Sequence, residues 1–526
     1  MSSNAIFTGL TDLPQDGCVV IKGSRIVDAG DKRLAGKWQG PQTKYLKFED
    51  QLIMPGFCES HAHIFFGALE FCSANVSGAR SEEEAVQMLA GFDHSAAGMW
   101  VIGFGWNRYA WEKDALPTKK TLDASFPDRP ALVFDAELHS LWVNSKTLEI
   151  CGINRNTPDP AGGKITRDAD NEPTGHLLEP AAMALVLDEA LQKGLEDERK
   201  LFQKYFKKTA ALGITSISAV PDFGLKKHGI YEELDRQGEL NLRIHLVESA
   251  NEKIEDLIRL RSRLTSGRLN FSGVKEFIDG TAMAHTGLLL EPYCDMPSYR
   301  GRPLVDIKSF TEKVVELDRH GFRIRLHACG DGAVRLALDI YEETRRINGP
   351  RDSRHTVEHI ENINPADLPR FRANGVIASV QPEHLSHDNY AGHPFHKILG
   401  KKRVEYAWPF KSLLTSGATV AFGSDHPVVD LNPLQGIYRA VTRLMDDGKP
   451  EGGWMPREKL SLAEALKGYT VFSAFQMFRE KDLGTLEAGK LADIIVLDRN
   501  IFGAAYEEIK EAKPLLTMLN GNVIHG

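Results

Sequence analysis

Cysteine is scarce in this sequence. The 526 residues contain six cysteines, with no Cys-x-x-Cys pair and no regular spacing between them. That pattern indicates neither a disulfide framework nor a thiolate zinc site. Free cysteine is commonly a small buried hydrophobic residue, so we expect buried, reduced thiols at Cys18, Cys58, Cys72, Cys151, Cys294 and Cys329.

Long apolar runs are also missing. No stretch approaches the ~18 apolar residues of a membrane-spanning helix. The start, MSSNAIFTGLTDLPQDG, has neither the positive n-region nor the apolar h-region of a signal peptide. We therefore expect a cytoplasmic protein that does not bind membranes.

The charge is mild and evenly spread. The formal net charge is −8, with no basic stripe and no long block of like charges, which argues against nucleic acid as a partner. With 42% hydrophobic and 26% charged residues, the composition is that of an ordinary globular protein. We expect a small-molecule substrate as the partner, and a homo-oligomer is compatible with the sequence.

Both ends of the chain are rich in short strands and turns. GCVVIKGSRIVDAG near the start has the pattern of a strand, a glycine turn and a second strand, and GTLEAGKLADIIVLDRN and LLTMLNGNVIHG near the end resemble it. Since chain termini often lie close together, we expect residues 1–52 and 484–526 to form one small β-sandwich domain.

The middle of the chain alternates apolar β-rich runs with helix-like segments, which is the signature of βα units. Eight such runs predict an α/β protein, with a (β/α)8 TIM barrel over residues 53–483. The runs are residues 52–63, 213–222, 241–249, 273–280, 322–331, 354–361, 375–384 and 418–425.

A long insertion separates the first two runs. Residues 66–195 include aromatic-rich GFGWNRYAWEKD and the Gly/Asp/Pro-rich NTPDPAGGKITRDADNEPTG. An insertion from the first βα loop emerges at the catalytic face of a barrel, so we expect a cap that shapes the substrate pocket. The alternative is an insertion without a role in the site.

The first run ends in two histidines, His61 and His63. Residues two apart on a strand share a face, so the two imidazoles can converge on a metal. Taken alone, the pair is equally typical of surface histidines at a strand end. Barrel enzymes collect their site residues from the carboxyl ends of several strands, however, and the later runs end in Lys275, His327, His359 and Asp425. Because imidazole and carboxylate suit zinc and related divalent ions, the set predicts a catalytic metal site.

The chain resembles the amidohydrolase superfamily, in the YtcJ-like branch that also includes N-substituted formamide deformylases. The resemblance rests on PGFCESHAH, HSLWVNSKTLEICGI, PTGHLLEPA, VKEFIDGT, HACGDGAV, VEHIE, GSDHPV and GTLEAGKLADIIVLD, which span almost the whole chain. One departure is Gly332, at a position where this branch usually has arginine, and it puts the substrate rather than the chemistry in doubt.

The resemblance implies two divalent metal ions, with zinc as the first choice and iron, manganese, cobalt or nickel as alternatives. His61 and His63 would hold the first ion, and His327 and His359 the second. Asp425 would contact the first ion and act as the catalytic proton shuttle.

The resemblance also implies that Lys275 bridges the two ions. An ammonium group has no acceptor for a cation, so the lysine would carry a CO2-derived carbamate. The alternative is an unmodified Lys275 paired with Asp279. The implied reaction is hydrolysis of a C–N bond in an amide, N-substituted formamide or cyclic amide by a metal-bridging hydroxide.

Further residues are candidates for binding the substrate, and a structural role is an equal alternative for each. They are Trp106, His139, Glu179, Asp279, His285 and His384. The loop SHDNYAGHPFHKILGKK, with His387, His393 and His396, is either a mobile lid or a solvated loop.

Two other function classes stay open at this point. The same ligand set serves metal-dependent lyases, isomerases and decarboxylases, because a fold does not fix a function. A catalytically silent binding or regulatory protein is the other alternative, and the complete ligand set argues against it.

Overall fold

Eight parallel strands form the central sheet. The structure is a computed structural model that describes residues 1–526 apart from 113–114, 192–197, 223 and 387–388. In sheet order the strands are β18 (Thr419–Phe422), β17 (Ile377–Val380), β16 (Thr356–His359), β15 (Ile324–Ala328), β14 (Leu269–Phe277), β13 (Arg243–Ser249), β12 (Ile214–Ala219) and β5 (Phe57–Ala62). Each overlaps one of the eight predicted runs, which confirms the barrel; β14 begins at Leu269, before its predicted run at residues 273–280.

The first and last strands of this sheet approach each other. The Asp425 N–H donates to the His61 carbonyl oxygen (2.8 Å), and Ala62 and His426 form an isolated parallel bridge. The sheet is therefore a nearly closed barrel, and this closing contact joins two of the predicted metal ligands.

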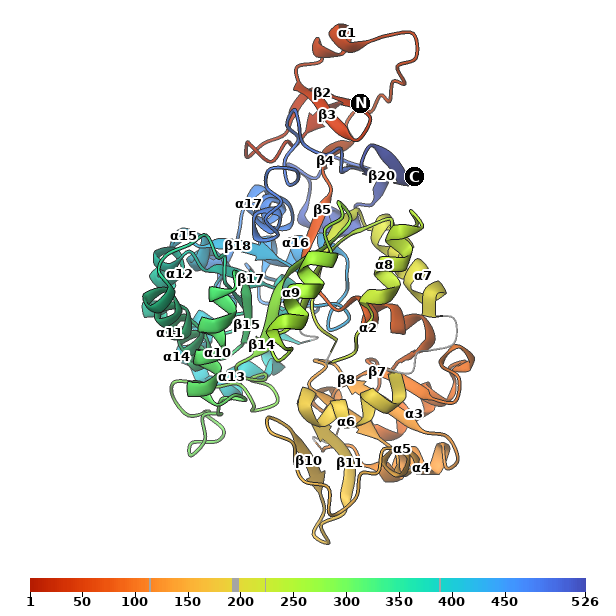
Figure 1. Cartoon of the computed structure of the whole chain (residues 1–526), viewed down its shortest axis with the longest axis vertical. Coiled ribbons are helices and arrows are strands. Elements are labelled where there is room, and N and C mark those ends of the chain that lie inside the picture. Colours follow the sequence, from red (N-terminus) through yellow and green to blue (C-terminus); the bar gives the residue numbers. More distant parts are fainter. Residues whose placement is uncertain (113–114, 192–197, 223, 387–388) are drawn as a thin grey trace.

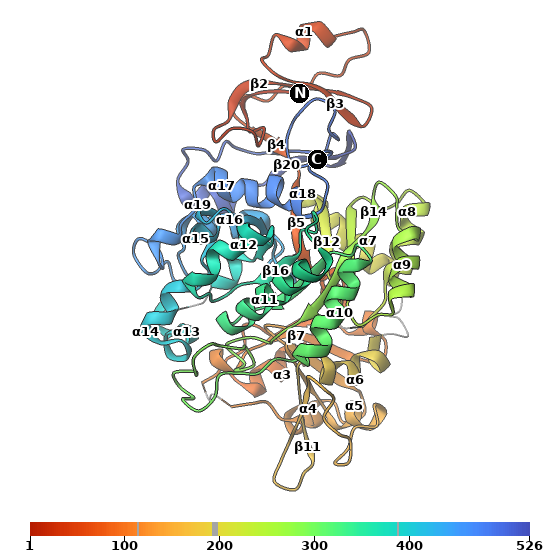
Figure 2. The ribbon, with the colours of Figure 1, turned by 60° about the vertical axis from the view of Figure 1, so that its left-hand side comes forward.

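Helices surround the barrel (Figures 1 and 2). They include α7 (Glu198–Ala211), α8 (His228–Arg236), α9 (Ile254–Arg263), α10 (Ile307–Arg319), α11 (Asp331–Asn348), α12 (Leu368–Asn374), α15 (Phe410–Thr415) and α16 (Pro433–Thr442). In α11, Ala337, Leu338 and Tyr341 are buried while Arg345 and Arg346 lie in the last turn. Apolar residues three and four apart turn one face to the sheet, and basic residues suit the negative end of the helix dipole.

The two ends of the chain meet in one seven-stranded sheet. Its order is β21 (Asn522–His525), β20 (Pro514–Leu519), β19 (Ile494–Leu497), β4 (Leu52–Pro55), β1 (Ser2–Ile6), β2 (Gln15–Lys22) and β3 (Arg25–Gly30). Strand β19 pairs with β4 in antiparallel fashion, and Ile53, Ile494 and Val496 are fully buried between the two ends. The two ends of the chain thus share one sheet, as the predicted fold requires, and in Figure 1 this sheet is at the top of the molecule.

The insertion builds a third sheet. Its order is β10 (Lys164–Arg167), β11 (Pro173–Leu178), β9 (Ser140–Val143), β8 (Ala131–Asp135), β7 (Val101–Trp106) and β6 (Ala74–Asn75). It has its own core, in which Leu89, Val133 and Trp142 are buried. The insertion lies at the end of the barrel opposite the terminal sheet (Figures 1 and 2).

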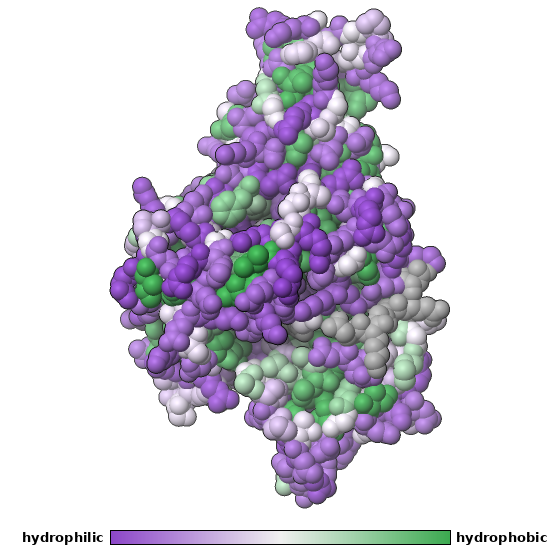
Figure 3. Space-filling model, in the orientation of Figure 1, coloured by the Kyte–Doolittle hydropathy of each residue, from purple (hydrophilic) through white to green (hydrophobic). Residues whose placement is uncertain are grey.

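The surface and the cysteines agree in part with the expectations. Hydrophilic residues cover most of the face in Figure 3, with apolar residues in small groups. Within the described chain, none of the helices has the length and apolar character needed to cross a membrane. All six cysteines are free, but the prediction of burial is wrong for Cys294, which is exposed, and Cys151 is only half-buried.

Candidate active site

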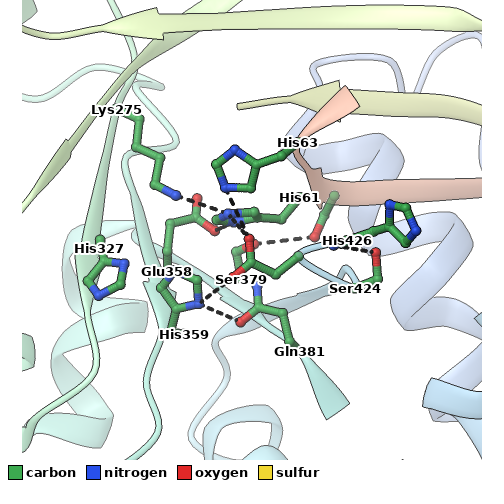
Figure 4. A network of polar contacts seen from close by, with 12 residues as sticks. His61, His63, Lys275, His327, Glu358, His359, Ser379, Gln381, Ser424 and His426 are labelled. Carbon is green, nitrogen blue, oxygen red and sulfur yellow. Dashed lines mark hydrogen bonds and ion pairs between the residues drawn. The ribbon is translucent and has the colours of Figure 1, made fainter. Parts of the chain in front are cut away.

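Both ring nitrogens of His61 have polar partners. Its Nδ1 lies 2.7 Å from Glu358 Oε2, and Arg325 Nε donates to the other oxygen of Glu358 (2.5 Å). All three side chains are fully buried. Because the carboxylate accepts the Nδ1 proton, the opposite ring nitrogen of His61 is left as a lone-pair donor. That Nε2 lies 3.0 Å from both Asp425 Oδ1 and Lys275 Nζ (Figure 4).

His63 and Asp425 complete a first group of ligand atoms. His63 Nε2 is 3.4 Å from Asp425 Oδ1, and His63 Nδ1 is 3.4 Å from Asp222 Oδ1. One ligand atom from each of His61, His63 and Asp425 lies within 4.8 Å of the others. Burial alone would raise the pKa of Asp425, but the two histidines outweigh it and hold the pKa well below its usual value. Asp425 is therefore a carboxylate.

A second group shares the same aspartate. His359 Nδ1 and His384 Nε2 lie 3.8 Å and 3.7 Å from Asp425 Oδ2, and the three residues again fall within 4.8 Å. His384 belongs to the short 3-10 helix η5 (Pro382–Leu385) that follows β17. His384, a predicted substrate residue, thus lies at a position where it could hold a metal. Asp425 lies between the two groups of histidines.

His327 lies beside this second group. Its ring centroid is 4.3 Å from that of His359, while its Nε2 is 3.3 Å from the Gly280 carbonyl oxygen and from Cys329 Sγ. Neither group of ligand atoms found in the described chain includes His327. Figure 4 shows its ring apart from the cluster around His61.

Lys275 is buried among aromatic rings. Its Nζ lies near His61 and 4.9 Å from the ring centre of Phe277, and burial lowers its pKa. Asp279, its alternative partner, instead accepts backbone N–H groups from Leu288, Cys329 and Gly330 at 2.8–3.0 Å. The lysine is thus directed to the histidine cluster and Asp279 fixes the loops around it.

The donor set fits a divalent metal. Among the histidines of the second group and His327 beside it, three buried ring nitrogens have no hydrogen-bond partner among the described residues: His327 Nδ1, His359 Nε2 and His384 Nε2. Buried polar atoms in proteins are normally satisfied, and neutral imidazole nitrogens beside a carboxylate are the ligands that zinc and similar ions prefer. Metal binding would therefore satisfy atoms that the folded chain leaves unsatisfied.

A cavity of about 470 Å³ opens onto these residues. His327, His359, His384 and Asp425 line it from the barrel, and the insertion contributes Asn107, Tyr109, Glu137 and His139. The insertion therefore forms part of the cavity wall, as a cap would.

The other predicted substrate residues lie at different distances from the cavity. Glu179 stands behind His139, with its Oε2 2.8 Å from His139 Nδ1. Trp106 lines a neighbouring cavity of about 140 Å³. His285 lies outside the described lining of both cavities and pairs with Asp295 (3.0 Å).

Glu179 requires a glycine on the barrel. A Cβ atom at Gly280 would lie 2.3 Å from Glu179 Oε1, so only glycine leaves room for this carboxylate. The Gly280 carbonyl oxygen also lies 3.3 Å from His327 Nε2. The insertion is thus packed against the loop that follows β14.

The loop after β17 reaches the main cavity, whereas Gly332 does not. His393 lines the main cavity, where its ring packs 4.8 Å from that of Trp454; His387 lies outside the described residues. Gly332 is not in the described cavity lining. A Cβ there would lie 2.9 Å from the Leu288 carbonyl oxygen, so close backbone packing explains this glycine.

Several residues of the site escaped the sequence analysis. Glu358 precedes His359 in VEHIE and, because neighbours on a strand face opposite sides, it turns to His61. Asp222 ends the second predicted run, and a carboxylate at that position was a usable signal. Gln381, which lies 2.9 Å from His359 Nδ1, gave no such signal.

The family match and the relatives given below identify the class of metal-dependent hydrolases that act on C–N bonds, and the parallel barrel with histidines and a carboxylate at the carboxyl ends of its strands agrees with this class. The amidohydrolase family matches residues 49–525, and the chain belongs to this family.

Relatives match over most of their length. The chain is 30% identical to protein LONG AFTER FAR-RED 3 of Arabidopsis thaliana, over 100% of this chain and 91% of that protein. It is 28% identical to the putative amidohydrolase YtcJ of Bacillus subtilis, over 99% and 98%, and 25% identical to the N-substituted formamide deformylase of Arthrobacter pascens, over 96% and 94%.

A solved structure matches at the level of the whole fold. The crystal structure of an uncharacterized metal-dependent hydrolase from Pyrococcus horikoshii is similar with a TM-score of 0.75 and 25% identity, over 96% of this chain and 98% of that one. The sequence relatives and the solved structure therefore agree on the class and the fold of this chain.

Proposed function

We propose that this enzyme hydrolyses the C–N bond of an amide, an N-substituted formamide or a cyclic amide with the help of two divalent metal ions, zinc in the first place. His61, His63 and Asp425 would hold one ion, and His359 with His327 or His384 the other. The observation that carries the proposal is the position of Asp425, whose two oxygens face the two groups of histidines. Bound ions would lower the pKa of water towards ~7 and polarise a carbonyl oxygen.

Asp425 is the proposed proton shuttle. It stays ionised because the histidines lower its pKa, so it can accept a proton from the attacking water. It then returns this proton to the leaving nitrogen, which must be protonated to depart as an amine.

Glu358 and Asp222 are proposed to orient two ligands. Each carboxylate faces the Nδ1 of one histidine, Glu358 that of His61 and Asp222 that of His63. Both imidazoles then present Nε2 to the metal, with the ring orientation fixed by the outer hydrogen bond.

Lys275 is proposed to carry the carbamate. The buried amine lies 3.0 Å from His61 Nε2, and a carbamate there would offer two oxygens beside the ligand groups. An unmodified lysine is the alternative, and the number of bound metal ions distinguishes the two.

The substrate is proposed to be a small molecule, because a cavity of about 470 Å³ is in the usual range for small-molecule sites. The similarity to a formamide deformylase supports formamides within the amide class. We also propose a cytoplasmic location, since six free cysteines suit a reducing compartment.

The test is hydrolysis of a panel of amides, formamides, cyclic amides and esters by the zinc-loaded or manganese-loaded enzyme. We expect turnover of at least one C–N substrate, which chelation abolishes and added metal restores. A fully loaded enzyme without turnover across the panel would favour a lyase, isomerase or decarboxylase.

A further inference from the structure

Carboxylates and histidines line the main cavity. Among the lining residues that the structure describes, none is lysine or arginine. The acidic ones are Glu137, Glu361, Glu383, Asp425 and Asp446. A substrate entering this cavity therefore meets several negative groups besides the metal ligands.

Most of these carboxylates have a partner. Arg439 lies behind the wall and binds Glu383 (2.8 Å) and Asp446 (2.6 Å). Asp425 lies between the histidines, and Glu361 Oε1 is 3.7 Å from His384 Nδ1. Their charges are thus balanced within the protein.

Glu137 is the exception. Its Oε2 accepts a hydrogen bond from Thr281 Oγ1 (2.7 Å), and it forms no ion pair with a lysine, arginine or histidine in the described part of the chain. The charge of His139, which pairs directly with Glu179, acts on Glu137 from beyond ion-pair distance. Burial first, and then repulsion by Glu361 and Asp135, raise the pKa of Glu137 to about 8. A cation beside this carboxylate would oppose both effects.

Glu137 also stands where two cavities adjoin. The main cavity and the 140 Å³ side cavity share Asn107, Tyr109, Ala136, Glu137 and Met283 in their linings. A substrate that extends from the main cavity into the side cavity therefore passes these shared residues, Glu137 among them.

The side cavity supplies an independent sign of a ligand. Trp106 and His176 line it and are 4% and 3% exposed. Trp106 Nε1 and His176 Nε2 are buried without a hydrogen-bond partner among the described residues. Since buried polar groups are normally hydrogen-bonded, both nitrogens indicate a polar ligand atom here.

Charge separates the roles of the two cavities. Arg108 lines the side cavity together with Asp135 and Glu137 and lies over the ring of Tyr109 (4.7 Å). This guanidinium offsets the negative charge of the side cavity and disfavours a second cation there. A neutral polar group such as a hydroxyl or carbonyl suits the side cavity. A positive group suits the main cavity beside Glu137.

We propose that Glu137 binds a positively charged group, an ammonium or amidinium, on the substituent of the substrate and makes the enzyme selective for cationic amides. The inference rests on the proposed function of the same site, because it names the class of amide that the site takes. Glu137 is a specificity residue in this account and takes no part in the proton transfers.

The experiment separates binding from turnover. Calorimetry with the metal-loaded full-length enzyme measures the affinity of three probes without an amide bond: 4-methylbenzylamine, 4-methylbenzyl alcohol and 4-methylbenzoate. Three N-benzylformamides with a para aminomethyl, hydroxymethyl or carboxylate group test turnover. The variant is Glu137→Gln, which keeps an oxygen for Thr281, and the matched control is Glu149→Gln at an exposed glutamate of the same insertion.

We expect the amine to bind about tenfold more tightly than the alcohol, and the cationic formamide to have the highest kcat/KM, as a buried charge pair predicts. Glu137→Gln should weaken amine binding about tenfold, change alcohol binding less than about twofold, and retain metal and fold. Equal binding of the three probes, tighter binding of the benzoate, absent amine binding, or an unchanged preference in Glu137→Gln would overturn the inference. Charge-selective binding without turnover of any formamide would sustain the inference and speak against the proposed hydrolysis.

Discussion

At the residue scale, the site depends on one carboxylate placed between two sets of imidazoles. Asp425 has φ +62°, in the left-handed region that non-glycine residues seldom adopt. Strain of this kind persists where the surrounding structure imposes it, and here the Asp425 N–H is tied to the His61 carbonyl oxygen. The backbone therefore aims the carboxylate at both groups.

Asp425→Asn should lower kcat strongly. The amide keeps the size of the side chain but cannot accept and return a proton, and general acid–base catalysis typically contributes about 10²–10⁴-fold. The measurement is kcat of the metal-loaded variant with its metal content determined on the same sample. Asp128→Asn, at an exposed aspartate, is the control; full activity in Asp425→Asn would remove the shuttle role.

The sequence located the clustered histidines and carboxylate better than the residues around them. His61, His63, Lys275, His359 and Asp425 could be found because each lies at or near the carboxyl end of a strand, and strand ends of a barrel converge. Glu137 could not be placed so, because it lies in a turn of the insertion, where tertiary packing alone fixes the position. His384 ends the predicted run at residues 375–384 and was expected only beside the substrate, because the short 3-10 helix that carries it gives no sequence signal of a position next to a metal.

At the element scale, the contact between β18 and β5 closes the barrel at the site. Gly423 follows β18, and a Cβ atom there would lie 2.5 Å from Glu59 Oε1 and 2.7 Å from the backbone nitrogen of His61. Glu59 Oε1 accepts the backbone N–H groups of His61 and Ser424 (both 2.9 Å). Any side chain at residue 423 would push these strands apart.

Gly423→Ala should therefore damage stability and metal binding together. Overpacking a close-packed interior typically costs about 1–3 kcal/mol of the free energy of unfolding. Chemical unfolding and metal content are the measurements. Gly229→Ala is the matched control, since a Cβ there meets no atom within 4 Å and alanine favours the helix; equal effects of the two substitutions would contradict this view of the closing contact.

The barrel strands could be predicted from the sequence, whereas the sheet of the insertion could not. Parallel strands buried on both faces have nearly continuous apolar sequences, as in β17 and β18, whose runs were found directly. The insertion mixes parallel pairs, β6 with β7 and β7 with β8, and antiparallel pairs. Its short strands have no sequence pattern that fixes this order.

At the scale of the whole molecule, the barrel is joined to the terminal sheet by a buried ion pair. Arg243 begins β13, and its Nε and Nη2 donate to the two oxygens of Asp493 at 2.6 Å and 3.0 Å. The side chains are 1% and 3% exposed. Asp493 also accepts the Asn520 N–H (2.8 Å), so one carboxylate connects three segments.

Asp493→Ala should destabilise the chain by about 3–5 kcal/mol, because it leaves Arg243 buried without its counter-charge. Asp16→Ala removes the exposed pair with Lys32 and should cost only about 0–1 kcal/mol. Urea unfolding of both variants gives the comparison. Similar losses in the two would show that the buried pair does not hold the domains together.

The central claim concerns the metal centre, and the most direct test is the number of metal ions per chain. Elemental analysis of protein purified without chelator or a nickel column measures it, alongside Lys275→Ala. We expect about two equivalents in the unmodified chain, as ligand groups on both sides of Asp425 require, and fewer in the variant. About one equivalent, unchanged in Lys275→Ala, would contradict the bridging lysine, and none, without activation by zinc or manganese, would contradict the metal centre itself.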